Sequence, residues 1–160
     1  MIVQGDVDFA DAFRTQGMVS LFGARIDGAL ICIGAQLENP GGLALNADGA
    51  TIKRGAFFTR GFRAEGVVAL DGANIGSVLL FEDAHVENPT SIALQASKMA
   101  VQGNVSFSNG TFKGSIWLLG AKIGGSLRLS TTMLRAGRSQ ASSGSMDSSI
   151  TALAAILSPT

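Results

Sequence analysis

An internal repeat of about 49 residues constrains this chain more than any other feature of its sequence. Residues 17–26 return as residues 66–75 and again as residues 114–123, at offsets of 49 and 48. An ungapped comparison of residues 17–59 with residues 66–108 finds 15 identities in 43 positions. A period of this length is typical of solenoids, in which each unit packs only on its neighbours.

Short pieces of alternating sequence fill each repeat unit. Apolar residues stand two positions apart, which is typical of a strand with one buried face. A glycine or a polar residue follows each piece and favours a turn. Eight such pieces in one unit predict two coils with four sides each. The first four pieces are Val19-x-Leu21, Ala24-x-Ile26, Leu30-x-Cys32 and Ala35-x-Leu37.

This pattern predicts an all-β fold, a right-handed parallel β-helix with about five four-sided coils over residues 3–129. Strands of successive coils would lie about 4.8 Å apart. Residues 49 apart would lie two coils apart in one column, so we expect Leu21, Leu70 and Leu118 to point to the same axis. The 21 glycines agree with a fold that has many corners, because a glycine inside a helix costs about 1 kcal/mol.

The motifs carry two resemblances to known families. The five-residue steps with alanine two positions before leucine or isoleucine resemble pentapeptide-repeat proteins, which fold as four-sided right-handed β-helices. Steps of six to eight residues interrupt that pattern. Gly23-Ala24-x-Ile26, Asn39-Pro40 and Ala44-Leu45 are similar to the repeat region of bacterial proteins that carry the label membrane-associated oxidoreductase. This resemblance covers residues 3–129 and implies the β-helical fold, whereas no cofactor motif accompanies the oxidoreductase label.

The sequence divides into a β-helix over residues 1–130, a flexible linker over 131–149 and an apolar tail over 150–160. The linker is rich in Ser, Gly and Ala. For the tail two interpretations stay open, a short helix that covers the last coil and a disordered end. The first strand begins in the middle of a repeat unit without an atypical capping repeat. We therefore expect the coil ends to bind a protein or a second copy of the chain, or the chain to be part of a longer reading frame.

Charged residues follow the inward residues of the fourth side. A basic residue follows each phenylalanine, and an acidic residue follows the inward residue on the interleaved coils. If these positions stack, they form an alternating charge ladder that fixes the register of the coils or serves as a binding strip. A second register remains open, in which Gln36 and His85 are the interleaved residues. The residues of the predicted charge ladder are Arg14, Glu38, Arg63, Glu87 and Lys113.

Two further positions are candidates for contacts or for chemistry. Trp117 lies between two inward positions and has Leu119 close by, so we expect an exposed apolar contact patch there. His85 is the only histidine and cannot build a multi-histidine metal site. Cys32, the only cysteine, is expected in the core, in one column with Phe81 and Leu129.

The sequence favours a structural or protein-interaction module without catalysis. The 12 basic and 12 acidic residues give a formal net charge of zero, so no nucleic-acid partner is expected. No phosphate-binding glycine motif and no acid–base pair is visible, so we expect no catalytic residue, metal or cofactor. No signal peptide or spanning segment is visible, which indicates a cytoplasmic protein. The alternatives are a β-helix enzyme that acts on a polysaccharide and a pentapeptide-type protein that protects a topoisomerase.

Overall fold

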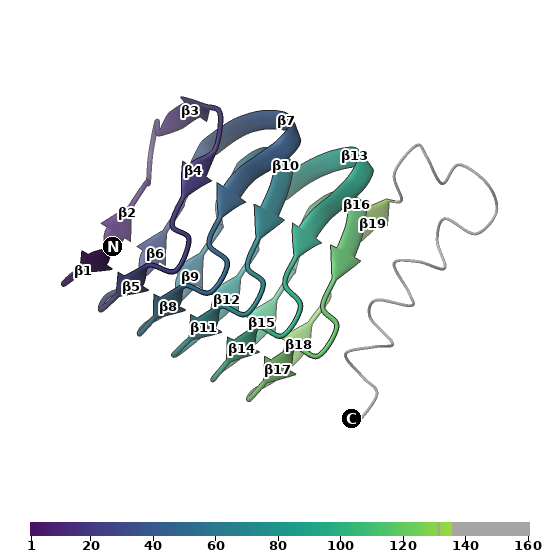
Figure 1. The fold of residues 1–160 in the computed structure, drawn as a ribbon. Helices are drawn as coiled ribbons and strands as arrows, with labels where there is room; N and C mark the ends of the chain where they lie inside the picture. Colours follow the sequence, from purple (N-terminus) through teal and green to yellow (C-terminus); the bar gives the residue numbers. More distant parts are fainter. Residues whose placement is uncertain (131, 136–160) are drawn as a thin grey trace.

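The chain forms a parallel β-solenoid in the computed structural model, which describes residues 1–130 and 132–135. The backbone winds through about six turns, and successive turns stack side by side (Figure 1). All strand pairs are parallel, and the described residues contain no helix. The predicted all-β parallel solenoid is therefore confirmed. The predicted linker and tail lie almost wholly outside the described residues.

Three parallel sheets make up the solenoid, and each turn contributes to all of them. Sheet A consists of β1 (Ile2–Val3), β5 (Arg25–Ile26), β8 (Thr51–Ile52), β11 (Asn74–Ile75), β14 (Ala100–Val101) and β17 (Lys122–Ile123). Sheet B consists of β2 (Val7–Asp8), β6 (Leu30–Ile31), β9 (Ala56–Phe57), β12 (Leu79–Leu80), β15 (Val105–Ser106) and β18 (Leu127–Arg128). Sheet C consists of β3 (Arg14–Gln16), β4 (Val19–Ser20), β7 (Gln36–Asn46), β10 (Arg63–Ala69), β13 (His85–Gln95), β16 (Thr111–Trp117) and β19 (Met133–Arg135).

Short and long coils alternate, and a short and a long coil together make the repeat. We number the coils 1 to 6 from the strand of sheet A with which each begins. Ile2 pairs with Arg25, 23 residues later, and Arg25 pairs with Thr51, 26 residues later. One short and one long coil add up to the 49-residue period. Coil 5, which runs from Ala100 to its partner Lys122, is one residue shorter than the other short coils. Strand β19 extends the pairing to Arg135, so the solenoid has about six coils rather than five and passes the predicted boundary at residue 130.

The four predicted sides are distributed over three sheets, because sheet C covers two of them. In coil 2 the inward residues Leu37 and Leu45 both belong to β7. The register against β10 shifts between them. The extra residues around Asn39 and Pro40 leave the pairing at this shift, which is a bulge within one strand. The side chain of Asn39 stabilises the bulge, since its Nδ2 donates to the carbonyl of Leu43 at 2.8 Å.

Stacked columns of apolar side chains form the core. Leu21, Leu70 and Leu118 lie in one column, as predicted from the repeat, because the residues before them pair across β4, β7, β10, β13 and β16. The residues between them in this column are Ala47 and Ala96, and all five are buried. Short coils therefore place a leucine where long coils place an alanine, which fills the interior without overpacking it.

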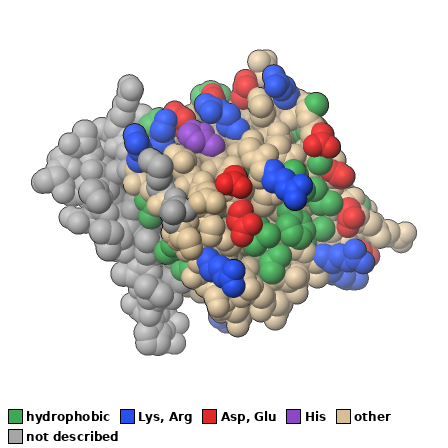
Figure 2. Space-filling model, turned by 180° about the vertical axis from the view of Figure 1, so that it is seen from behind, with side chains coloured by type: hydrophobic (Ala, Val, Ile, Leu, Met, Phe, Trp, Pro, Cys, Tyr) green, Lys and Arg blue, Asp and Glu red, His purple; other side chains and the backbone are tan. Residues whose placement is uncertain are grey.

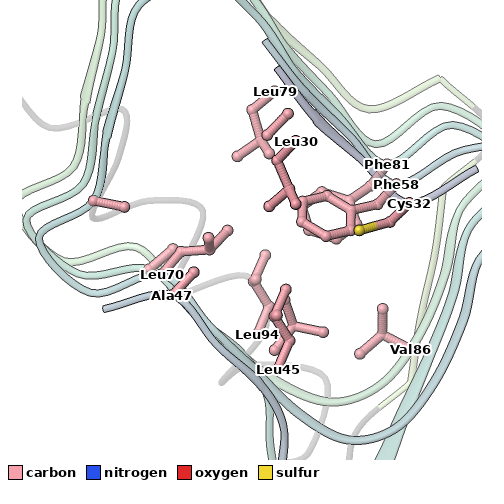
Figure 3. Packing of buried hydrophobic residues seen from close by; sticks show 14 of the residues in the cluster. Leu30, Cys32, Leu45, Ala47, Phe58, Leu70, Leu79, Phe81, Val86 and Leu94 are labelled. Atoms are coloured by element: carbon pink, nitrogen blue, oxygen red, sulfur yellow. The ribbon is translucent and has the colours of Figure 1, made fainter. Parts of the chain in front are cut away.

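A stack of aromatic rings follows sheet B on the inside. Phe58 and Phe81 have ring centroids 4.7 Å apart with an interplanar angle of 10°, and Phe81 and Phe107 are 5.6 Å apart at 15°. Figure 3 shows Cys32 in line with Phe58 and Phe81. The pairing of β6, β9, β12, β15 and β18 places Leu129 in the same column. The predicted grouping of Cys32, Phe81 and Leu129 is therefore confirmed.

Candidate functional site

The residues of the predicted charge ladder fall into two separate columns on the outer surface of sheet C. Arg14 and Arg63 both lie opposite Gln36, and Arg63 lies opposite His85 on its other side. Neither arginine lies directly opposite a glutamate of the neighbouring strand. The predicted alternation of Arg14, Glu38 and Arg63 is therefore wrong, and the second register, with Gln36 and His85 interleaved, is the observed one.

The second column is acidic over three coils and then basic. Glu38 pairs with Glu65, Glu65 with Glu87, and Glu87 with Lys113. Lys113 in turn pairs with Arg135. Only Glu87 and Lys113 are neighbours as the predicted charge ladder requires, and Nζ of Lys113 lies 3.3 Å from Oε2 of Glu87.

One corner explains why the ladder is out of register. Six positions separate Phe57 from Arg63 in coil 3, whereas five separate Ser106 from Thr111 in coil 5. Lys113 also lies seven positions after Ser106, one more than Arg63 lies after Phe57, so the shorter corner places Lys113 two positions further along its strand than Arg63. A shift of two residues keeps both side chains on the outer surface but gives them different neighbours, so the similar sequences around Arg63 and Lys113 occupy different columns.

Glu87 is the centre of a charged cluster. Its Oε2 lies 3.0 Å from Nε2 of His85, 3.3 Å from Nζ of Lys113 and 3.9 Å from Arg63. Arg63 also contacts Glu65, with Nη2 2.9 Å from Oε1. The hydrogen bond with His85 is the main cause that lowers the pKa of Glu87, and Lys113 adds to it. These neighbours offset the repulsion between the carboxylate of Glu87 and that of Glu65, which lies opposite it in the acidic column.

Replacing Glu87 with glutamine is expected to destabilise the fold by about 0.5 kcal/mol near pH 7, because partly exposed ion pairs contribute little. The folded state lowers the pKa of Glu87, so its contribution is present above the ordinary value and is lost as the pH falls through the folded-state value. Urea unfolding of both proteins at pH 7 and at pH 3 measures the difference, which should shrink at pH 3.

Glu38→Gln is the matched control for this prediction. Glu38 lies in the same column, but no basic group of the described residues lies within ion-pair distance of its carboxylate. The Glu38→Gln protein should therefore differ from the wild type by the same small amount at both pH values. A Glu87→Gln effect that is equal at pH 7 and pH 3 would contradict the role of the ionised carboxylate.

A shallow hollow of about 260 Å³ lies beside this cluster. Two bulges line it, at Pro40–Gly41 and Asn88–Pro89, together with Glu65 and Glu87. Asn88 is buried, and its Nδ2 donates to the carbonyl of Ile92 at 2.8 Å, as Asn39 does to Leu43. The repeated Asn-Pro pairs therefore shape the backbone, in agreement with the turn role of these residue types.

The outer face of sheet B carries a second hollow, of about 330 Å³. Ile31, Phe57 and Leu80 lie in one outward column, because β6 pairs with β9 and β9 with β12. All three are only partly buried. In Figure 2, hydrophobic side chains gather on the face seen from behind, with acidic and basic side chains around them. We call the surface formed by Ile31, Ile33, Phe57 and Leu80 the B face.

Three charged residues border the B face at the corner toward sheet C. Arg60, Glu82 and Asp83 line the same hollow as Phe57 and Leu80. Arg60 and Asp83 have positive φ angles of 50° and 55°, which hold them at the tips of their turns. Among the described residues, none of the three has an ion pair within 4.0 Å. Charges that no internal partner neutralises next to an apolar surface are typical of the rim of an interface.

The predicted contact patch consists of two exposed side chains on coil 5. Trp117 is 51% exposed and Leu119 is 69% exposed. Phe22, also 69% exposed, lies in the column of Leu119 but at the other end of the solenoid. Asp48 and Asp71 lie between them in this column, where Asp48 Oδ1 accepts the backbone N–H of Asp71 at 2.8 Å. The apolar residues of this column therefore do not form one continuous strip.

The remaining candidates for chemistry have structural surroundings. Cys32 is fully buried, and burial raises the pKa of its thiol far above the ordinary value. A nucleophile needs an accessible thiolate, so Cys32 behaves as a core residue. His85 contacts Glu87 as described above. In residues 1–130 and 132–135 no group of three His, Cys, Asp or Glu side chains is arranged to hold a metal ion. The same residues include no helix with the length and apolarity to cross a membrane.

Sequence reasoning missed the B face, although a signal for it was present. Three consecutive apolar residues occur in coils 2, 3 and 4, at 30–32, 56–58 and 79–81. In a strand that is buried on one side only, the middle residue of such a triplet points outward. An apolar residue at that position in three successive coils indicates an apolar outer column, and this column contains Ile31, Phe57 and Leu80.

Comparison with protein-family models, with curated proteins and with solved structures gives no match for this chain. The description of the molecule as a parallel β-solenoid therefore depends on its own repeat, register and core.

Proposed function

We propose that this chain is a repeat module that acts by binding protein through the B face and has no catalytic role. The observation that carries this proposal is the outward column of Ile31, Phe57 and Leu80 beside a hollow of about 330 Å³. Water covers the outside of most solenoid coils, so an aligned apolar column on that side marks a contact surface.

The rim of the B face supports a protein as the ligand. Arg60, Glu82 and Asp83 lack internal ion pairs in the described part of the chain, and they offer both signs of charge within one hollow. A mixed rim around an apolar centre is how protein interfaces are built. A polyanion or a purely cationic ligand would be repelled by part of this rim.

The charge pattern favours this proposal over the two alternatives. The acidic column is limited to Glu38, Glu65 and Glu87, and Lys113 and Arg135 continue it. A protein that mimics DNA needs a longer acidic stripe. A hydrolase needs one carboxylic acid kept neutral and one ionised. In the acidic column the pKa of Glu87 is lowered by its hydrogen bond with His85. Burial raises the pKa of Asp48 in another column, but its Oδ1 accepts the backbone N–H of Asp71 and so has a structural role.

The test compares the proteins retained by the full chain with those retained by a Phe57→Asp, Leu80→Asp double variant. Both side chains point outward, so the variant should keep the β-solenoid, which circular dichroism and thermal unfolding check. We expect at least one protein that the wild type retains to be lost from the variant, because two carboxylates in an apolar contact leave buried charges without partners.

Thr51→Asp with Asn74→Asp is the matched control. These residues lie on the same two coils, 3 and 4, but on the exposed outer side of sheet A. The control should retain the same proteins as the wild type. If the Phe57→Asp, Leu80→Asp variant retains them as well, the B face is not the binding surface and the proposal is wrong.

A further inference from the structure

We propose that the partner of the B face is a second copy of this chain, held by a two-fold axis that runs parallel to the strands of sheet B between β9 and β12. This inference rests on the proposed function, because it names the occupant of the same surface. It follows from the order of side chains along the outward column of sheet B, which is complementary to itself.

The outward column runs through all six coils. Successive strand pairs place Asp8, Ile31, Phe57, Leu80, Ser106 and Arg128 in this column, from coil 1 to coil 6. An acid stands at one end and a base at the other, and between them lie three apolar residues and Ser106, which is buried and hydrogen-bonded to Ser108. Asp8 and Arg128 are exposed, and neither has an ion pair among the described residues.

A two-fold axis between coils 3 and 4 reverses the order of the column. Coil 1 of one copy then faces coil 6 of the other, and coil 3 faces coil 4. Asp8 therefore meets the Arg128 side chain of the second copy, and Phe57 meets its Leu80. A two-fold interface repeats each contact, so each of these pairs forms twice.

The rim at the corner between sheets B and C is complementary under the same axis. Arg60 belongs to coil 3, and Glu82 and Asp83 belong to coil 4. The axis leaves positions along the strand unchanged while it exchanges these two coils. Arg60 of each copy then faces Glu82 and Asp83 of the other. At the opposite corner Arg54 of coil 3 faces Ser77 of coil 4, so no like charges are brought together.

The geometry is that of two aligned β-sheets packed face to face. Such sheets lie about 10 Å apart with their strands roughly parallel, and the large side chains of Phe57 and Leu80 suit that spacing. Only the outward side chains of short strands take part, so the contact is small. We expect a weak, concentration-dependent dimer with a Kd in roughly the micromolar range.

Sedimentation equilibrium of the purified full chain over a concentration series tests the inference. The wild type should shift from monomer to dimer and stop there. Arg60→Glu should weaken association roughly tenfold, because it places acids opposite Glu82 and Asp83. The double variant Glu82→Lys, Asp83→Asn should weaken it similarly, with asparagine chosen because it tolerates the positive φ of position 83.

Mixing the two charge variants is the decisive measurement. In a mixed dimer the acidic replacement at position 60 faces the basic replacement at position 82, and the unchanged Arg60 of the second protein faces the unchanged Glu82 and Asp83 of the first. The mixture should therefore associate more tightly than either variant alone. A general loss of folding cannot produce this recovery. Lys122→Glu, on the exposed outer side of sheet A, should leave association unchanged.

Three results would overturn this inference. One is a wild type that stays monomeric over the whole concentration range. Another is growth beyond the dimer, which indicates association through the coil ends. The third is a mixture that associates no better than its components. In each case the binding test with Phe57→Asp, Leu80→Asp still decides the proposed function, because it measures retention of other proteins by the same face.

Discussion

Replacing Phe81 with alanine is expected to lower the free energy of unfolding by about 4 kcal/mol, since removing a buried phenylalanine ring costs about 3–5 kcal/mol. Phe81 is fully buried at the centre of the aromatic stack, with ring contacts to Phe58, Phe107 and Phe112. Its removal leaves a cavity in coil 4 that the rings of coils 3 and 5 border. Urea unfolding followed by circular dichroism measures the loss.

Phe9→Ala is the control for this prediction, because Phe9 precedes Cys32 in the same column. Phe9 lies on coil 1 and is only partly buried, and Phe13 is its one ring neighbour in the described residues. The substitution should cost about 1–2 kcal/mol, since less apolar area is lost from burial. If the two variants lose the same stability, the aromatic stack is not the part of the core that holds the central coils together.

Replacing Gly66 with alanine is expected to cost about 3 kcal/mol or more, through strain and a steric clash together. Gly66 has a φ of +122°, which L-residues rarely adopt. A Cβ at this position would lie 2.5 Å from the carbonyl oxygen of Asn39 and 2.8 Å from that of Gly42. The bulge of coil 2 would have to move away from coil 3, which breaks the register of sheet C. Urea unfolding monitored by circular dichroism measures the loss.

Gly17→Ala separates the two contributions. Gly17 also has a positive φ, +101°, but a Cβ there would meet no atom within 4 Å. It should therefore show the strain alone, roughly 1 kcal/mol. Gly114 resembles Gly66, because its Cβ would lie 2.6 Å from the carbonyl oxygen of Asn88. If the alanine substitutions at Gly17 and Gly66 lower the free energy of unfolding equally, the close approach of the bulge to Gly66 does not contribute to stability.

The repeat predicted the core well, because inward side chains follow a simple rule. A strand buried on one side must alternate, and a solenoid must repeat that alternation at the same places in every second coil. The stacking of Leu21, Leu70 and Leu118 and the column that contains Cys32 and Phe81 follow from these requirements. The number of sheets did not follow, because a bulge and a corner look alike in sequence.

The charged surface was predicted less well, since its partners depend on corners. The corner of coil 5 is one residue shorter than that of coil 3, and Lys113 follows Ser106 at one residue more than Arg63 follows Phe57, so the two basic residues lie in columns two positions apart. The sequence pattern does not reveal this shift, because apolar and polar residues alternate in the same way after a longer and after a shorter corner. The sequence suggested the alternative register with Gln36 and His85, but it gave no reason to prefer that register over the predicted charge ladder.

By itself the sequence determined that the chain winds into stacked parallel strands around an apolar axis, because its 49-residue period and its alternation allow few other structures. Only the tertiary structure decided which outward side chains become neighbours across coils. That choice joins Glu87 with Lys113 and places Arg63 opposite His85. The physical reason is that inward positions are fixed by burial, whereas outward neighbours are set by the length of each corner.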